Sequence, residues 1–123
     1  MKEKVVILGA SNKPERYAYK AFKMLQEYGH TPIPVNPAFD EIEGVKVSKT
    51  LEEVSDVDTV TLYMNPQRLV EQVERLIHLK PRRVIFNPGT ESKEIEQKLE
   101  NAGIKTLEAC TLVLLRTNQF EDK

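Results

Sequence analysis

The chain is poor in the features that mark several classes of protein. Its 123 residues include a single cysteine, Cys110. One cysteine cannot form an intramolecular disulfide, so the sequence excludes a small secreted domain held together by disulfides. No apolar run approaches the roughly 20 residues that are needed to cross a bilayer. Both observations favour a protein of the reducing cytoplasm.

An excess of charge of one sign is also missing. The 18 basic and 19 acidic side chains give a net charge of −1 and are interspersed along the chain. Such a balance provides no field for nucleic acid or for an anionic membrane surface, and we expect neither as a partner. Residues 1–4 lead directly into an apolar segment, so we expect no signal peptide. A local cationic site for one small anion is still compatible with this composition.

What the sequence does contain is an alternation of short apolar runs and amphipathic segments. The length and an apolar content of 40% predict one domain over residues 1–123, with residues 121–123 as a frayed tail. We expect strands at Lys4–Leu8, Thr31–Val35, Gly44–Ser48, Asp58–Tyr63, Arg83–Phe86 and Ile104–Leu107. We expect helices at Tyr17–Tyr28, after Asn65-Pro66, at Glu91–Ala102 and at Thr111–Leu115, and one helical turn at Thr50–Val54. The buried faces of the second and third long helices are expected to carry Leu69, Val70, Val73, Leu76 and Ile77, and Ile95, Leu99 and Ala102.

This order of elements predicts an α/β fold. Strands that alternate with helices form a parallel sheet with helices on both faces, and right-handed crossovers give a Rossmann-like doubly wound layout. We expect about six strands in the spatial order 3-2-1-4-5-6, and ligands bind such sheets beyond the carboxyl ends of the strands, where the order reverses. The crevice at that point would lie between Gly9–Arg16 and Met64–Pro66.

The segment Gly9–Arg16, with the sequence GASNKPER, has the composition of a phosphate-binding loop. Its glycine allows a tight turn after a buried strand, and Ser11 and Asn12 can donate hydrogen bonds to phosphate oxygens. Lys13 and Arg16 add positive charge where the first helix presents its free N–H groups. A solvated turn is the alternative for any one of these residues. Together they predict a phosphate site.

The dinucleotide fingerprint G-x-G-x-x-G is only partly present. The loop keeps the first of its glycines, Gly9, and the second strand is followed by Asn36 rather than by an acid that would bind a ribose hydroxyl. Ordinary NAD binding is therefore disfavoured. NADP stays open, because a nearby cation could meet its additional phosphate.

Two strings of this sequence, VILGASNKPERYA and the PVNP that follows some twenty residues later, resemble the small stand-alone CoA-binding domain family. That family shares its fold with the CoA-binding domain of the succinyl-CoA ligase α subunit. The resemblance extends from Lys4 to Leu115 and includes the Asn65-Pro66 pair and Cys110.

The resemblance implies that coenzyme A, or an acyl-CoA, binds across the switch point. It implies that the phosphates are held by Gly9, Ala10, Ser11, Asn12, Lys13, Arg16 and Tyr17. It implies that Val35, Asn36 and Pro37 lie by the adenosine, and that the rest of the ligand is flanked by Tyr63, Met64, Asn65, Pro66, Asn87, Pro88 and Gly89. Relatives often carry Lys or Arg directly after the VNP triplet, where the 3′-phosphate can be met, whereas this chain has Ala38.

Candidate catalytic groups are few. We expect His30 at the surface after the first long helix and His78 near the end of another helix, and a catalytic role for neither. No spacing of His, Cys, Asp or Glu indicates a metal site. Cys110 is the one candidate nucleophile. The favoured interpretation is instead that Cys110 is a small buried residue that packs at the end of a strand.

Three functions remain in view. The favoured one is a non-catalytic CoA-binding protein, with an expected homodimer. The second is a small enzyme that depends on NADP or another adenine nucleotide. The third is a partner-binding scaffold whose crevice is filled by its own side chains, Phe39 or Met64.

Overall fold

The computed structural model describes residues 2–121 as an alternation of strands and helices. The strands are β1 (Lys4–Leu8), β2 (Thr31–Val35), β3 (Glu41–Ile42), β4 (Val45–Lys46), β5 (Thr59–Leu62), β6 (Arg83–Phe86) and β7 (Lys105–Glu108). The α-helices are α1 (Tyr17–Glu27), α2 (Pro66–Leu69), α3 (Val73–Leu79), α4 (Lys93–Asn101) and α5 (Thr111–Arg116). Two 3₁₀ segments are η1 (Leu51–Glu53) and η2 (Val70–Gln72).

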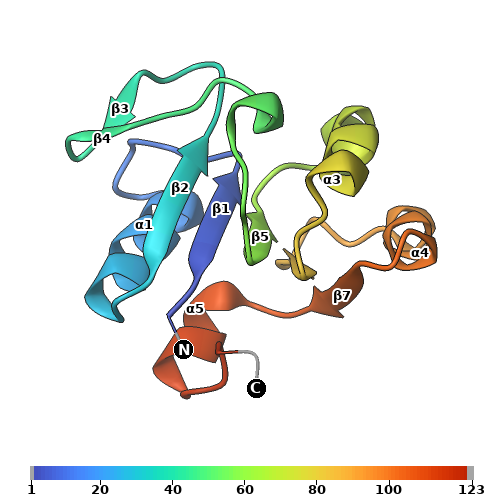
Figure 1. The fold of residues 1–123 in the computed structure, drawn as a ribbon. Coiled ribbons are helices and arrows are strands. Elements are labelled where there is room, and N and C mark those ends of the chain that lie inside the picture. Colours follow the sequence, from blue (N-terminus) through green and yellow to red (C-terminus); the bar gives the residue numbers. More distant parts are fainter. Residues whose placement is uncertain (1, 122–123) are drawn as a thin grey trace.

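Five of the strands form one parallel sheet in the order β2-β1-β5-β6-β7. This arrangement confirms the predicted Rossmann-like α/β fold and the reversal of strand order between β1 and β5. The expected third strand, Gly44–Ser48, is wrong as a member of this sheet. Only Val45–Lys46 is a strand, and it pairs antiparallel with β3 in a separate hairpin beside the carboxyl end of β2 (Figure 1).

The prolines of β2 give the physical reason for the missing sixth strand. On the outer edge of β2, the Pro34 carbonyl accepts a hydrogen bond from Ser48 N at 3.0 Å. Pro32 and Pro34 have no N–H to donate on that edge, so a longer ladder cannot form there. Ser48 is joined to β2 by a single bridge, to Val35.

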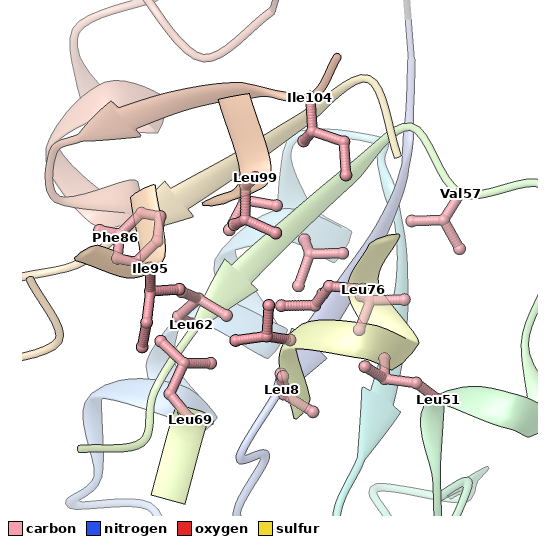
Figure 2. Close-up of a cluster of buried hydrophobic side chains, with 14 of the residues drawn as sticks. Leu8, Leu51, Val57, Leu62, Leu69, Leu76, Phe86, Ile95, Leu99 and Ile104 are labelled. Carbon is pink, nitrogen blue, oxygen red and sulfur yellow. The ribbon is translucent and has the colours of Figure 1, made fainter. Parts of the chain in front are cut away.

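Helices cover both faces of the sheet. Alternate residues of the strands point to opposite sides, so Val6 and Leu8 face α3 and α4, while Val5 and Ile7 face α1 and α5. Figure 2 shows the first of these two cores, and its labelled residues include Leu8, Leu62, Leu69, Leu76, Phe86, Ile95 and Leu99. Full burial of such side chains contributes about 1.5–3 kcal/mol each and fixes the carboxyl ends of β1 and β5.

Two helix predictions need correction. The chain after Asn65-Pro66 is interrupted by η2, and Val70 is 58% exposed instead of buried, whereas Leu69, Val73 and Leu76 are buried as predicted. A 3₁₀ segment has about three residues per turn. A buried face predicted from 3.6 residues per turn therefore assigns some residues of this segment to the wrong side of the helix.

The helix predicted at Glu91–Ala102 begins later, at Lys93, because the Ser92 hydroxyl caps it by accepting a hydrogen bond from Ile95 N at 3.3 Å. Ala102 follows the last turn and is exposed, so its predicted inward position is wrong.

A buried polar network closes the amino ends of the strands. The guanidinium of Arg83 donates to the Glu3 carboxylate at 3.3 Å and to the Thr59 hydroxyl at 2.8 Å, and both charged side chains are almost fully buried. It also donates to the Phe120 carbonyl and lies 4.7 Å from the centre of the Phe120 ring. The C-terminal segment thus covers this end of the sheet.

His30 belongs to the same closed end, so its expected surface position is wrong. Its Nδ1 accepts a hydrogen bond from the backbone N–H of Glu3 at 3.0 Å, and its ring meets Phe120 edge-on at 4.9 Å. Of the predicted frayed tail, Glu121 forms an ion pair with Lys2 at 3.1 Å, and residues 122–123 lie outside the described residues. No helix within residues 2–121 is long and apolar enough to cross a membrane.

Candidate functional site

A groove of about 710 Å³ opens at the carboxyl ends of β1, β2 and β5. Its size lies within the range of small-molecule sites. The loops after these three strands form its walls, together with η1 and the α2–α3 region. From the predicted site it collects Gly9, Ala10, Ser11, Lys13, Arg16, Tyr17, Val35, Asn36, Pro37, Tyr63, Met64 and Asn65.

Gly9 shapes the tight turn between β1 and the groove. Its φ of +94° lies in the region that favours glycine, and a Cβ placed there would come 2.6 Å from the Tyr63 carbonyl oxygen. Its N–H donates to the Val35 carbonyl at 3.0 Å. The glycine therefore lets three loops approach one another closely.

Asn36 fastens the β2 wall to the β1 wall. Its Nδ2 donates to the Ala10 carbonyl at 2.8 Å, and its Oδ1 accepts from Ala38 N at 2.8 Å. An aspartate at this position could accept the second bond but not donate the first. The residue that replaces the acid of dinucleotide-binding proteins thus has a structural role in the loop.

The amino end of α1 opens onto the groove. Its N-cap residue is Arg16, which makes no side-chain capping bond, and the first turn of the helix contains no acid. The N–H groups of that turn are therefore without a side-chain cap, and Arg16, Tyr17 and Ala18 line the groove beside them. Lys13 adds a second cation. An anion is the ligand that this arrangement suits.

Tyr63 lines the groove, and its carbonyl lies next to Gly9. Burial raises the pKa of the Tyr63 phenol to about 12. The phenol therefore stays protonated near neutral pH and is unsuited to act as a general base.

Five predicted residues, namely Asn12, Pro66, Asn87, Pro88 and Gly89, do not line the groove. Asn87 has a different role, because its side chain is buried and fully engaged. Its Nδ2 donates to the Leu62 carbonyl at 2.8 Å and to the Thr61 hydroxyl at 2.6 Å, and its Oδ1 accepts from Thr111 N at 2.9 Å. Asn87 thereby joins β5 to α5.

The groove also contains cations that the sequence reasoning did not select. Lys49, Arg68 and Arg75 line it along with Phe39, Thr50, Glu71 and Gln72. Lys49 follows the expected strand Gly44–Ser48, so placing that strand beside β2 would have brought Lys49 to the same edge of the sheet. With Lys13 and Arg16, five cations face one acid, Glu71, among the lining residues.

Groups suited to catalysis or metal binding lie elsewhere. His30 is at the opposite end of the sheet, His78 is exposed in the last turn of α3, and Cys110 is half-buried before α5, outside the groove lining. Within residues 2–121 no three His, Cys, Asp or Glu side chains are grouped so that they could hold a metal ion.

Comparison with known proteins gives consistent matches. The sequence model described as a CoA-binding domain matches residues 3–116. The uncharacterised protein YneT of Bacillus subtilis (strain 168) is 28% identical over 102 residues, which are 82% of this chain and 76% of YneT. The α subunit of the ADP-forming acetate–CoA ligase II of Pyrococcus furiosus is 35% identical over 69 residues, which are 55% of this chain but 15% of that subunit. A crystal structure of an uncharacterised protein shares 42% identity and a TM-score of 0.94, covering 98% of this chain and 99% of the other.

Proposed function

The chain belongs to the CoA-binding domain family, and from that premise we propose that it is a non-catalytic protein that binds coenzyme A or an acyl-CoA. In this proposal the Gly9–Arg16 loop holds the pyrophosphate at the amino end of α1. The observation that carries it is the uncapped start of α1, which opens with Lys13 and Arg16 onto one groove. Backbone N–H groups, the helix dipole and two cations together suit a pyrophosphate.

The remaining walls suit the rest of the ligand. Val35, Asn36 and Pro37 lie on the β2 side, where the proposal puts the adenosine, and Met64 offers apolar surface to the pantetheine arm. Asn87 is assigned a structural role, because its polar atoms are already bonded to Leu62 and Thr111. We also propose a cytoplasmic location, which the lone cysteine supports.

Titration of the purified protein with CoA tests this function. We expect CoA to raise the Tm, by an amount equivalent to about 2.7 kcal/mol at a concentration of 100 Kd. Replacing Lys13 and Arg16 by Ala should weaken binding at least about tenfold, because each loses a charge-assisted bond to phosphate. The matched control, Lys98→Ala with Arg116→Ala, removes two exposed cations outside the groove and should leave the affinity unchanged.

Two results would point to the alternatives. A shift with NADPH and none with millimolar CoA would favour a nucleotide-dependent enzyme. No shift with either nucleotide would favour the scaffold, although Phe39 and Met64 line an open groove and do not fill it. Titration with acetyl-CoA beside CoA separates an acyl-CoA ligand from the free thiol.

The homodimer stays a prediction. Light scattering coupled to size exclusion, with and without CoA, measures the mass of the particle directly. A monomer under both conditions would contradict it.

A further inference from the structure

The five cations of the groove come from two groups of elements. The first group is Lys13 and Arg16, in the loop that leads into α1, which packs on one face. The second group is Lys49, which precedes η1, with Arg68 of α2 and Arg75 of α3, two helices that pack on the other face (Figure 1). One pyrophosphate at α1 does not account for the second group.

The ammonium of Lys49 lies against the loop that follows β2. Its Nζ is 2.9 Å from the Phe39 carbonyl oxygen and 3.4 Å from that of Pro37. These carbonyls flank Ala38, whose own side chain carries no charge. Lys49 therefore supplies positive charge where the loop itself has none, on the wall beside Asn36.

The backbone holds Lys49 in this place. Ser48 makes two backbone hydrogen bonds along the outer edge of the β2 end: its N–H donates to the Pro34 carbonyl at 3.0 Å, and its carbonyl accepts from Asn36 N at 2.9 Å. The Lys49 N–H donates to the Glu53 carboxylate at 3.1 Å. The side chain is thus anchored at its base while its charged end reaches the groove.

The acidic partner of Lys49 is one that a phosphate can replace. Asp40 Oδ1 is 2.7 Å from Nζ, but the Asp40 side chain is 96% exposed. Ion pairs of such exposed groups are screened by solvent and contribute little. A doubly charged phosphate at the same ammonium is the stronger acceptor.

Arg75 lines the same groove from α3. Its Nε is 3.7 Å from the Glu52 carboxylate on η1, the segment that begins two residues after Lys49. Both side chains of that pair are also exposed, and a guanidinium can bind phosphate through two parallel hydrogen bonds.

We propose that Lys49, assisted by Arg75, forms a second anion subsite that binds the ribose 3′-phosphate of CoA. The inference rests on the proposed function, since it assigns the second phosphate group of the same ligand. It makes Lys49 the residue that selects CoA over nucleotides with a pyrophosphate but no separate ribose phosphate.

Calorimetry with CoA and with 3′-dephospho-CoA tests this assignment in the full chain. The wild type should prefer CoA by about tenfold or more, as a charge-assisted bond predicts. Lys49→Met, which keeps the apolar stem, should reduce that preference to within about twofold and leave the affinity for 3′-dephospho-CoA unchanged. Arg75→Met should reduce it by a smaller factor.

Lys23→Met is the matched control. Lys23 is similarly exposed and pairs with Glu43 at 3.2 Å, but it does not line the groove, so its loss should keep the preference for CoA intact. Asp40→Asn removes the competing carboxylate and should tighten CoA binding without affecting 3′-dephospho-CoA.

Three results separate the possibilities. If Lys49→Met weakens both ligands equally, Lys49 only fastens the loop and the assignment is wrong. If the wild type binds both ligands with equal affinity, the assignment is wrong while the proposed function stands. If the wild type binds neither ligand, the proposed function fails, and the assignment fails with it.

Discussion

The two ends of the central sheet both collect charged side chains, but in opposite environments. At the amino ends of the strands, Glu3 and Arg83 are buried and bonded to each other and to Thr59. At the carboxyl ends, Lys13 and Arg16 are exposed along an open groove. A charged residue near a strand end therefore indicates a ligand site only when the structure shows that it is not buried and paired within the protein.

The difference follows from what covers each end. The C-terminal segment brings Phe120 over Arg83 and excludes water from the guanidinium. A buried guanidinium without hydrogen-bond partners would destabilise the fold, so each of its bonds contributes to stability. Nothing comparable in residues 2–121 covers Lys13 or Arg16, whose charges stay hydrated and contribute little to folding. Stability should therefore depend on one end and ligand affinity on the other.

Arg83→Ala should produce the largest effect, a loss of about 3–5 kcal/mol in the free energy of unfolding, because it removes the buried guanidinium that pairs with the buried Glu3 carboxylate. Chemical denaturation measures the loss. Arg82→Ala is the control, since Arg82 is half-exposed and its contacts with Glu3 and Asp58 are 3.7 and 3.4 Å long; it should cost less than about 1 kcal/mol. Equal losses in the two variants would contradict the contrast between the ends.

Gly9→Ala should have the next largest effect, and it acts at the open end. The new Cβ would meet the Tyr63 carbonyl oxygen at 2.6 Å, and the backbone would have to hold a φ of +94°. We expect a loss of about 1–3 kcal/mol in the free energy of unfolding, and weaker CoA binding because the loop is displaced.

Gly89→Ala provides the comparison for that variant. Gly89 has the same φ of +94°, but a Cβ there has nothing within 4 Å. It should show the backbone cost alone and leave CoA affinity unchanged. If both variants lose the same stability and bind CoA equally, the close approach at Gly9 does not matter.

The sequence predicted the strands well where local signals were strong. Lys4–Leu8 and Arg83–Phe86 have the predicted bounds, because short apolar or β-branched runs end at clear breakers. Thr31–Val35 also has its predicted bounds, although Pro32 and Pro34 weakened the local signal for a strand. Gly44–Ser48 was misplaced because its pairing depends on which donors Pro32 and Pro34 lack on one edge, a property of the assembled sheet.

The sequence predicted the Gly9–Arg16 loop of the candidate site, but it predicted only in part which residues of more distant loops line the groove. Gly9–Arg16 carries its chemistry in one contiguous segment that precedes a helix. Asn87 was selected because the family resemblance implies that its loop flanks the ligand, and only the fold reveals that its amide is bonded to Leu62 and Thr111. His30 was expected at the surface because Gly29 ends the helix, while its covering partners come from residues 3 and 120.

His30 offers the smallest and most selective test of the closed end. Burial lowers the pKa of its imidazole, although the Glu3 carboxylate opposes part of that effect. In the unfolded chain the group titrates near its ordinary value of about 6.5. Below that pH the unfolded state takes up a proton that the folded state resists, so stability falls as the pH decreases, by at most about 1.4 kcal/mol per pH unit.

His30→Gln removes the titrating group, so it should reduce the loss of unfolding free energy between pH 7.5 and pH 5.5 relative to the wild type, as measured by denaturation at both values. His78→Gln is the control, because His78 is exposed in the last turn of α3 and its loss should leave the decline in place. CoA affinity should be the same in both variants, since neither histidine lines the groove. A decline with pH that persists undiminished in His30→Gln would show that protonation acts through other groups, and that this buried imidazole does not couple pH to the closed end of the sheet.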